Sequence, residues 1–247
     1  MFLPLKDINP TTRRPVVTIS LIAINILVYL YQMAQGQAGF HAITASLGAT
    51  PFEITHMTDL VGRMGYHIVH YPGPKPIVLT LFTSMFLHGS ILHLGGNMLY
   101  LWIFGNNIED ILGPVKFIVF YLICGMAAHA LHIASDPSSI IPTVGASGAI
   151  AGVLGAYLIA YPHARILTLM FLFIFIRLAV VPAFVIIIFW FFIQLVSGLT
   201  SLGGMATGGV AWFAHIGGFL AGIALIYAMA GKTIHWLRHG GGYYDEI

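Results

Sequence analysis

Long apolar segments, in a chain with almost no charge, constrain this fold more than any other feature. The 247 residues include only 10 lysines and arginines and 8 aspartates and glutamates, so charged residues make up 7% while apolar residues make up 58%. The mean hydropathy is +0.91. Ordinary soluble domains carry about a quarter charged residues. The composition therefore predicts a polytopic membrane protein.

Six segments approach the length of about 20 apolar residues that a helix needs to cross a bilayer. They predict a single all-α membrane domain over residues 1–247, a six-transmembrane-helix bundle with spans at about 16–31, 87–108, 115–133, 147–161, 182–198 and 210–230. The apolar stretch between the fourth and fifth spans is bracketed by Arg165 and Arg177 and is too short to cross comfortably. We expect it to be a surface-lying or partly helical connection, with an extra span as the alternative.

The basic residues predict how the chain is oriented. If six spans alternate, all of the lysines and arginines except Arg63 and Lys75 fall on one side. The positive-inside rule then places both termini in the cytoplasm. The loop at about 34–76 lies outside, where its YPGPKP run excludes helix and its apolar residues favour the membrane surface. The lack of a transit peptide and of added domains favours a prokaryotic cytoplasmic membrane.

Charge and cysteine content exclude several other classes. The net charge is +2 and the basic residues are scattered, so we expect no nucleic-acid partner. The single cysteine, Cys124, lies in an apolar stretch, which favours a small buried residue over a disulfide or a cysteine metal site. The lipid bilayer is the one partner that composition implies, and the oligomeric state is unknown.

The segment GASGAIAG places one hydroxyl, that of Ser147, among small residues. Ser147 lies at the predicted start of the fourth span, near its outer end. The start of a helix leaves backbone N–H groups unpaired. A hydroxyl beside free N–H donors is one half of an acyl-transfer site. The alternative is an N-cap or a small packing residue.

A histidine in the sixth span supplies the other half. The fourth and sixth spans carry glycines four residues apart, which allow two membrane helices to approach closely, and these are Gly148 and Gly152 in one and Gly218 and Gly222 in the other. His215 shares a helix face with the second pair. If the glycine stripes pair, His215 meets Ser147 within the bilayer and can act as its base. No carboxylate lies in the core of a span, so we expect a dyad; the alternative is a packing histidine.

Two further polar side chains lie in the segment HLGGN of the second span. His93 and Asn97 are four residues apart and share a helix face toward the outer end. Both can donate hydrogen bonds to an oxyanion. The alternative is a hydrogen bond between helices. His129 and His132 in the third span also share a face and could bind a metal, but we expect neither a metal nor another cofactor.

These motifs, in this order over residues of about 16–230, resemble the rhomboid intramembrane serine proteases. The resemblance implies a bundle with a water-accessible cavity, Ser147 as nucleophile and His215 as general base and acid. The Ser147 N–H and the side chains of His93 and Asn97 would form the oxyanion site, and Gly145 would line the approach. It also implies single-pass transmembrane proteins as substrates, cut near the outer end of their span. Glu109, in GNNIEDILG, takes the place of a structural glutamate.

The chain departs from the family pattern in two places. Many relatives carry a Trp-Arg pair in the first external loop, which has no tryptophan here. Some relatives stack an aromatic residue, four positions after the nucleophile, on the catalytic histidine, and this chain has Ala151 there. We expect Trp212 or Phe213 to hold His215 instead. The fifth span and the loop at 199–209, with its glycines Gly203, Gly204, Gly208 and Gly209, would form a side door and lid.

Two other function classes remain open at this point. A catalytically inactive rhomboid-like protein that binds membrane proteins would keep the fold but lose the dyad, and this chain has both of its members. A small transporter would use the intramembrane histidines for transport and would typically carry charged residues in its spans, which this chain lacks.

Overall fold

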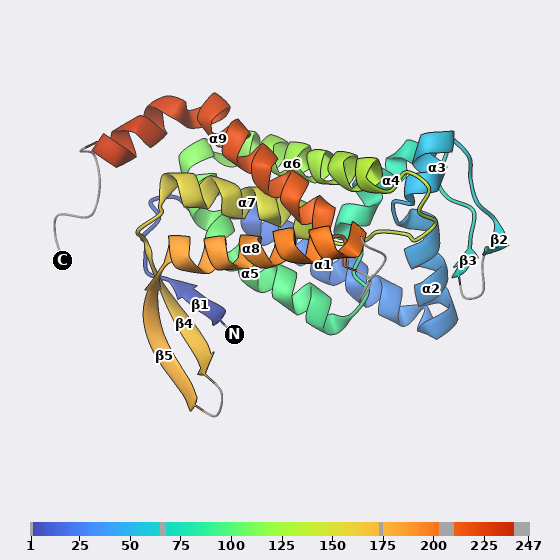
Figure 1. The fold of residues 1–247 in the computed structure, drawn as a ribbon, viewed down its shortest axis with the longest axis horizontal. Coiled ribbons are helices and arrows are strands. Elements are labelled where there is room, and N and C mark those ends of the chain that lie inside the picture. Colours follow the sequence, from blue (N-terminus) through green and yellow to red (C-terminus); the bar gives the residue numbers. More distant parts are fainter. Residues whose placement is uncertain (1, 65–67, 173–174, 203–209, 240–247) are drawn as a thin grey trace.

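The computed structural model describes residues 2–64, 68–172, 175–202 and 210–239, and its six long helices lie side by side (Figure 1). Each of the six predicted segments forms a helix. These helices are α1 (Val16–Ala34), α5 (Ile91–Leu112), α6 (Pro114–Ser135), α7 (Ser147–Ala160), α8 (Ala183–Leu202) and α9 (Trp212–His239). The predicted fold class, a polytopic helical bundle, is confirmed.

Four of the described helices are long and apolar enough to cross a membrane, namely α1, α6, α8 and α9 over Trp212–Leu237. Ile77–Phe86 and Ile91–Leu112 together would make a fifth span, bent by 78°. Helix α7 has only 14 residues, of which 11 are buried. Because protein rather than lipid surrounds α7, its ends can find polar partners inside the bundle. The count of six spans stays a prediction.

Local signals in the sequence explain where the helices begin. The Ser90 side chain accepts a hydrogen bond from His93 N at 3.1 Å and so caps the start of α5. Gly113 has a φ of +72° that ends α5, and Pro114 then opens α6 at a position where its missing N–H costs nothing.

Glu109 near the end of α5 holds the start of α1. Its carboxylate accepts hydrogen bonds from Val17 N, Thr18 N and Thr18 Oγ1, each at 2.8 Å. The first turn of a helix has unpaired N–H groups and a partial positive charge, so a carboxylate placed there satisfies both. These three hydrogen bonds explain why a carboxylate can be buried here, where Glu109 is 3% exposed.

Shorter elements cover the two ends of the bundle (Figure 1). A three-stranded antiparallel sheet at one end has the order β1-β4-β5, with β1 at Phe2–Asp7, β4 at Arg165–Leu172 and β5 at Phe175–Pro182. The other end carries α2 (Gly36–Leu47), α3 (Pro51–His56), β2 (Gly62–Met64) and β3 (Ile68–His70). Three short helical pieces lead into α5, and they are η1 (Ile77–Leu79), α4 (Thr80–Thr83) and η2 (Ser84–Phe86).

The connection between α7 and α8 corrects the sequence analysis. A surface-lying or partly helical connection was expected there, with an extra span as the alternative. The helical expectation and the extra span are wrong, because the chain forms the β4-β5 hairpin, with Arg165 opposite Pro182. Strand β1 pairs with β4 and completes the sheet. The segment is rich in β-branched and aromatic residues, which favour strands, and pairing with β1 satisfies a further row of backbone groups. The YPGPKP run is non-helical, as predicted.

Asp7 at the end of β1 ties the sheet to the central helix. The Tyr157 hydroxyl of α7 donates a hydrogen bond to Asp7 Oδ2 at 2.7 Å, and Asn9 N donates to Asp7 Oδ1 at 2.8 Å. Burial raises the pKa of the Asp7 carboxyl from 3.8 to about 6, against the opposing effect of these hydrogen bonds. The folded chain therefore binds this proton more tightly than the unfolded chain.

We predict that Asp7→Asn stabilises the protein above pH 6. With respect to this group, the wild-type protein is most stable below about pH 4 and loses stability as the pH rises through about 6. An uncharged asparagine can accept from Asn9 N through Oδ1 and donate from Nδ2 to the Tyr157 hydroxyl oxygen, so both contacts are kept. The gain at pH 7.5 is therefore about 1–3 kcal/mol. Thermal unfolding in detergent at pH 4 and pH 7.5 measures it. An equal difference between wild type and variant at both pH values would contradict the assignment.

Candidate active site

The glycine stripes of α7 and α9 face each other at backbone contact. A Cβ placed on Gly218 would overlap the carbonyl of Gly148, and one placed on Gly222 would overlap the carbonyl of Gly152. Helix α6 closes the third side, since a Cβ on Gly148 would also lie 2.6 Å from Ala128 Cβ. The structure therefore places the two glycine stripes against each other.

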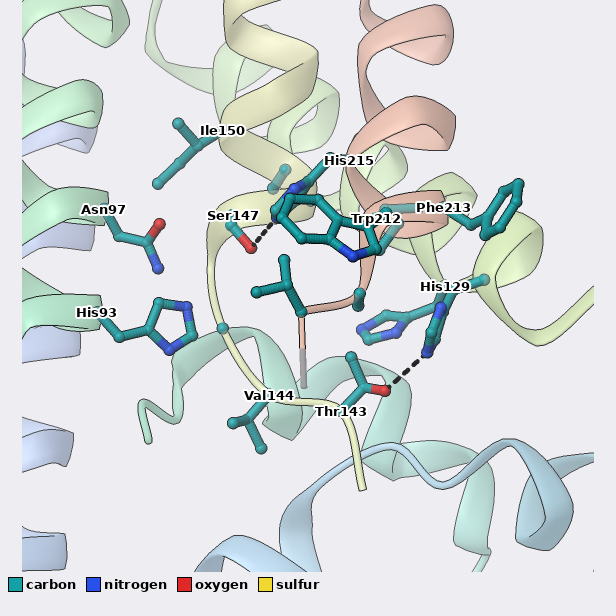
Figure 2. A pocket seen from close by; sticks show the side chains of 18 of the residues that line it. His93, Asn97, His129, Thr143, Val144, Ser147, Ile150, Trp212, Phe213 and His215 are labelled. Atoms are coloured by element: carbon teal, nitrogen blue, oxygen red, sulfur yellow. Dashed lines mark hydrogen bonds between the residues drawn. The ribbon is translucent and has the colours of Figure 1, made fainter. Parts of the chain in front are cut away.

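This contact brings Ser147 and His215 together. Ser147 Oγ lies 2.8 Å from His215 Nε2 (Figure 2). The serine opens α7 and the histidine is in the first turn of α9, so both belong to the same end of the bundle. The amide of Ser147 precedes the hydrogen bonds of its helix, the first of which runs from Ile150 N to Ala146 O at 3.0 Å. A hydroxyl, an imidazole and a backbone donor therefore share one site.

Helix α8 holds the far side of the imidazole. Gln194 Oε1 lies 2.7 Å from His215 Nδ1. The ring centroid of Trp190 is 5.7 Å from that of His215, and the ring of Trp212 meets it edge-on at 6.4 Å. Both distances lie in the range of aromatic ring pairs. The expectation for Trp212 is thus met, whereas Phe213 points away from His215 (Figure 2).

Gly145 lies directly beside His93 and close to the serine hydroxyl. Its φ is +130°, a backbone conformation that side chains rarely adopt. A Cβ at this residue would lie 2.8 Å from His93 Nε2 and 3.6 Å from Ser147 Oγ, so both atoms border the same point in space. Gly145 N donates to Ser84 O at 2.9 Å, which fixes the loop. A side chain at this position would therefore crowd His93, and the bare glycine keeps the approach to His93 and Ser147 clear.

Asn97 is held by a histidine that the sequence analysis did not assign. Asn97 Nδ2 lies 2.9 Å from His88 Nε2, and both residues are buried. The amide nitrogen has two hydrogens, so one remains for another acceptor. The ring of His88 also meets that of His93 edge-on, with centroids 5.1 Å apart.

The two histidines of α6 contact hydroxyls of η2 and of the loop before Ser147. His129 Nε2 lies 3.0 Å from Ser84 Oγ, and His132 Nε2 lies 3.0 Å from Thr143 Oγ1 (Figure 2 shows the latter contact). Among the described residues, no group of three or more histidine, cysteine, aspartate or glutamate side chains could hold a metal ion. The partners that the structure gives these two imidazoles are hydroxyl groups.

A cavity of about 1010 Å³ opens beside these groups. The cavity is lined by the predicted site residues His93, Asn97, Gly145, Ser147 and His215. Two tryptophans, Trp190 and Trp212, also line it. Helix α8, the predicted side door, contributes Trp190, Ser201 and Leu202 to the cavity wall. The predicted hinge glycines Gly203, Gly204, Gly208 and Gly209 lie outside the described residues.

Comparison with known proteins identifies the family. The Rhomboid domain matches residues 75–232, and the chain belongs to the Rhomboid family. Rhomboid protein 1, mitochondrial, of Saccharomyces cerevisiae is 35% identical over 97 residues, which are 38% of this chain and 28% of that protein. Presenilin-associated rhomboid-like protein, mitochondrial, of Mus musculus is 29% identical over 136 residues, 54% of this chain and 36% of that protein.

A bacterial relative carries an enzyme name. Rhomboid protease GluP of Bacillus subtilis is 44% identical over 78 residues, which are 32% of this chain and 15% of that protein. The chain therefore matches little more than a third, at most, of the length of these relatives.

The sequence analysis missed three residues that contact the site, namely Trp190, Gln194 and His88. A signal for Gln194 was present, because an amide in the middle of the apolar run FWFFIQL is costly unless it has a partner. Trp190 lies one turn before it on the same helix face. His88 precedes its helix, so periodicity could not place it.

We predict that Gly145→Ala abolishes most reactivity at Ser147 while the protein stays folded. The added methyl would occupy the space between His93 and Ser147 and strain the backbone. Labelling of Ser147 by a fluorophosphonate should fall about 10- to 100-fold, as expected when reacting groups are displaced by about 1 Å. Gly96→Ala is the control, because Gly96 lines the same cavity and has open space around its Cβ position. Equal labelling of both variants would disprove the role of this space.

Proposed function

We propose that the protein is an intramembrane serine endopeptidase that works through Ser147 and His215. The observation that carries the proposal is the 2.8 Å contact between Ser147 Oγ and His215 Nε2 at the edge of a large cavity. Membership of the Rhomboid family, which includes a protein named as a protease, supports the same chemistry.

The reaction follows the usual course of serine acyl transfer. Ser147 Oγ attacks the carbonyl carbon of the scissile peptide bond while His215 Nε2 takes the hydroxyl proton. The tetrahedral intermediate collapses, the C–N bond breaks, and His215 gives its proton to the leaving amine. A water molecule, deprotonated by His215, then attacks the acyl-enzyme, and the proton returns to Ser147. The reaction needs no cofactor.

The oxyanion is stabilised by three donors. The Ser147 amide lies at the start of α7, before the hydrogen bonds of the helix begin, and it benefits from the positive end of the helix dipole. His93 Nε2 borders the space above Gly145, and Asn97 has an amide hydrogen to spare beyond its contact with His88. Donors fixed in advance stabilise the developing charge without reorganisation.

We propose single-pass transmembrane proteins as substrates. A stable helix hides its peptide carbonyls in its own hydrogen bonds, so a substrate must unwind to reach Ser147. The side door is α8, because its outer face is exposed and apolar and it contributes to the cavity wall, with Phe192 60% and Leu199 66% exposed.

The protein is a multi-pass membrane protein, and we propose that both termini lie in the cytoplasm, as the basic residues predict. The sheet end of the bundle, with Lys6 and Arg165, would then be cytoplasmic and the Ser147 end would face outward. The relatives include mitochondrial and bacterial proteins, so a prokaryotic cytoplasmic membrane stays a prediction.

A serine-directed fluorophosphonate probe tests this function. We expect the purified protein in detergent to be labelled once, at Ser147, and Ser147→Ala to show no labelling. His215→Asn should reduce the labelling rate by about 100-fold or more, because a positioned general base contributes about 10²–10⁴.

Ser135→Ala is the matched control, since Ser135 lines the same cavity but donates its hydroxyl to His132 O. It should be labelled like the wild type. Absence of labelling in folded wild-type protein would favour the catalytically inactive binding protein or the transporter over the enzyme.

A further inference from the structure

The polar environment of His215 includes one group with no assigned role. Gln194 is 4% exposed and lies in the middle of α8, a helix whose other buried residues are alanine, isoleucine and glycine. Burying an amide costs free energy unless its hydrogen bonds are made. Both ends of this amide are paired, with His215 on one side and the backbone of α8 on the other.

The backbone contact determines which way the amide points. Gln194 Nε2 lies 3.1 Å from Trp190 O. A carbonyl oxygen can only accept a hydrogen bond, so the amide nitrogen must face Trp190. The oxygen Oε1 then faces His215 Nδ1, at 2.7 Å.

This orientation determines the tautomer of His215. Because Oε1 can only accept, the proton of the neutral imidazole must be on Nδ1. Nε2 then carries the lone pair, and that lone pair points at the Ser147 hydroxyl 2.8 Å away. In the other tautomer, Nε2 would carry a hydrogen and could not take the serine proton.

We infer that Gln194 is the positioning residue of this site, which holds His215 in the base-competent tautomer and ring orientation. The inference rests on the proposed serine protease function. Gln194 does not touch the reacting atoms, and it takes the place that a carboxylate has in a serine triad. An amide performs this task without a charge, which suits an apolar bundle in which an unpaired carboxylate would be costly.

Gln194→Met and Gln194→Glu test the inference. Methionine fills a similar volume but offers no oxygen, so the second-order rate of fluorophosphonate labelling should fall about 10- to 100-fold, between the effect of one neutral hydrogen bond and that of a lost general base. Glutamate keeps the acceptor toward His215 but loses the donor toward Trp190 O, and it should retain labelling at high pH, where the carboxylate is ionised. The acidic limb of its pH–rate profile should move up by about one unit or more, because a carboxylate favours the imidazolium. A purely structural role would not produce this shift.

Ile193→Met is the matched control. It places the same side chain one residue away on the same helix, at a position that is 40% exposed. We expect wild-type labelling and a wild-type pH profile.

The tautomer of His215 can also be measured directly, by NMR and independently of activity. In protein labelled with [15N]histidine, the His215 resonances, assigned by their loss in His215→Asn, should show Nδ1 protonated in the wild type and in Ile193→Met. Gln194→Met should show Nε2 protonated or a mixture.

The outcomes separate the two proposals. Wild-type labelling and tautomer in Gln194→Met would overturn the positioning role, as would an Nε2-protonated His215 in the wild type. If the wild-type protein is not labelled but its tautomer depends on Gln194, the positioning role stands and the protease function fails. If Gln194→Met does not fold, the shifted pH profile of Gln194→Glu supports the role and an unshifted one refutes it.

Discussion

The backbone contact between α7 and α9 is the constraint on which the site depends. At Gly148 and Gly152 the carbonyls of one helix occupy the space that side chains at Gly218 and Gly222 would need. In lipid, helices associate through such close packing rather than through a hydrophobic driving force. The same contact sets the separation of the first turns of the two helices, and therefore the distance between Ser147 and His215.

The second feature of the site is that the described side-chain hydrogen bonds of His215 and Asn97 go to hydroxyl, amide and imidazole groups. His215 contacts a hydroxyl on one side and an amide on the other, and Asn97 contacts a histidine. The buried carboxylate of Glu109 is not among the residues that line the cavity, and three hydrogen bonds from the start of α1 satisfy it. Because α8 is both the proposed side door and the carrier of Gln194, movement of this helix would change substrate access and the alignment of the base together.

The sequence was most informative where a feature depends on spacing within one helix. The positions of all six helices follow from apolar runs, and the meeting of Ser147 with His215 follows from glycines four residues apart. It was least informative where no spacing pattern links the two partners. Nothing local indicates that Gln194 faces His215, and the β4-β5 hairpin takes its form from pairing with β1 at the other end of the chain.

The most direct test of this account is the labelling rate of Ser147 as Gly222 is enlarged to alanine, valine and leucine, with the same three changes at Gly231 as the control. Gly231 lies on the same helix with open space around it. We predict that the rate falls with each added carbon at Gly222, since the helices must separate, and stays constant at Gly231. A wild-type rate in Gly222→Leu would contradict the claim that glycine contact brings the serine and the histidine together.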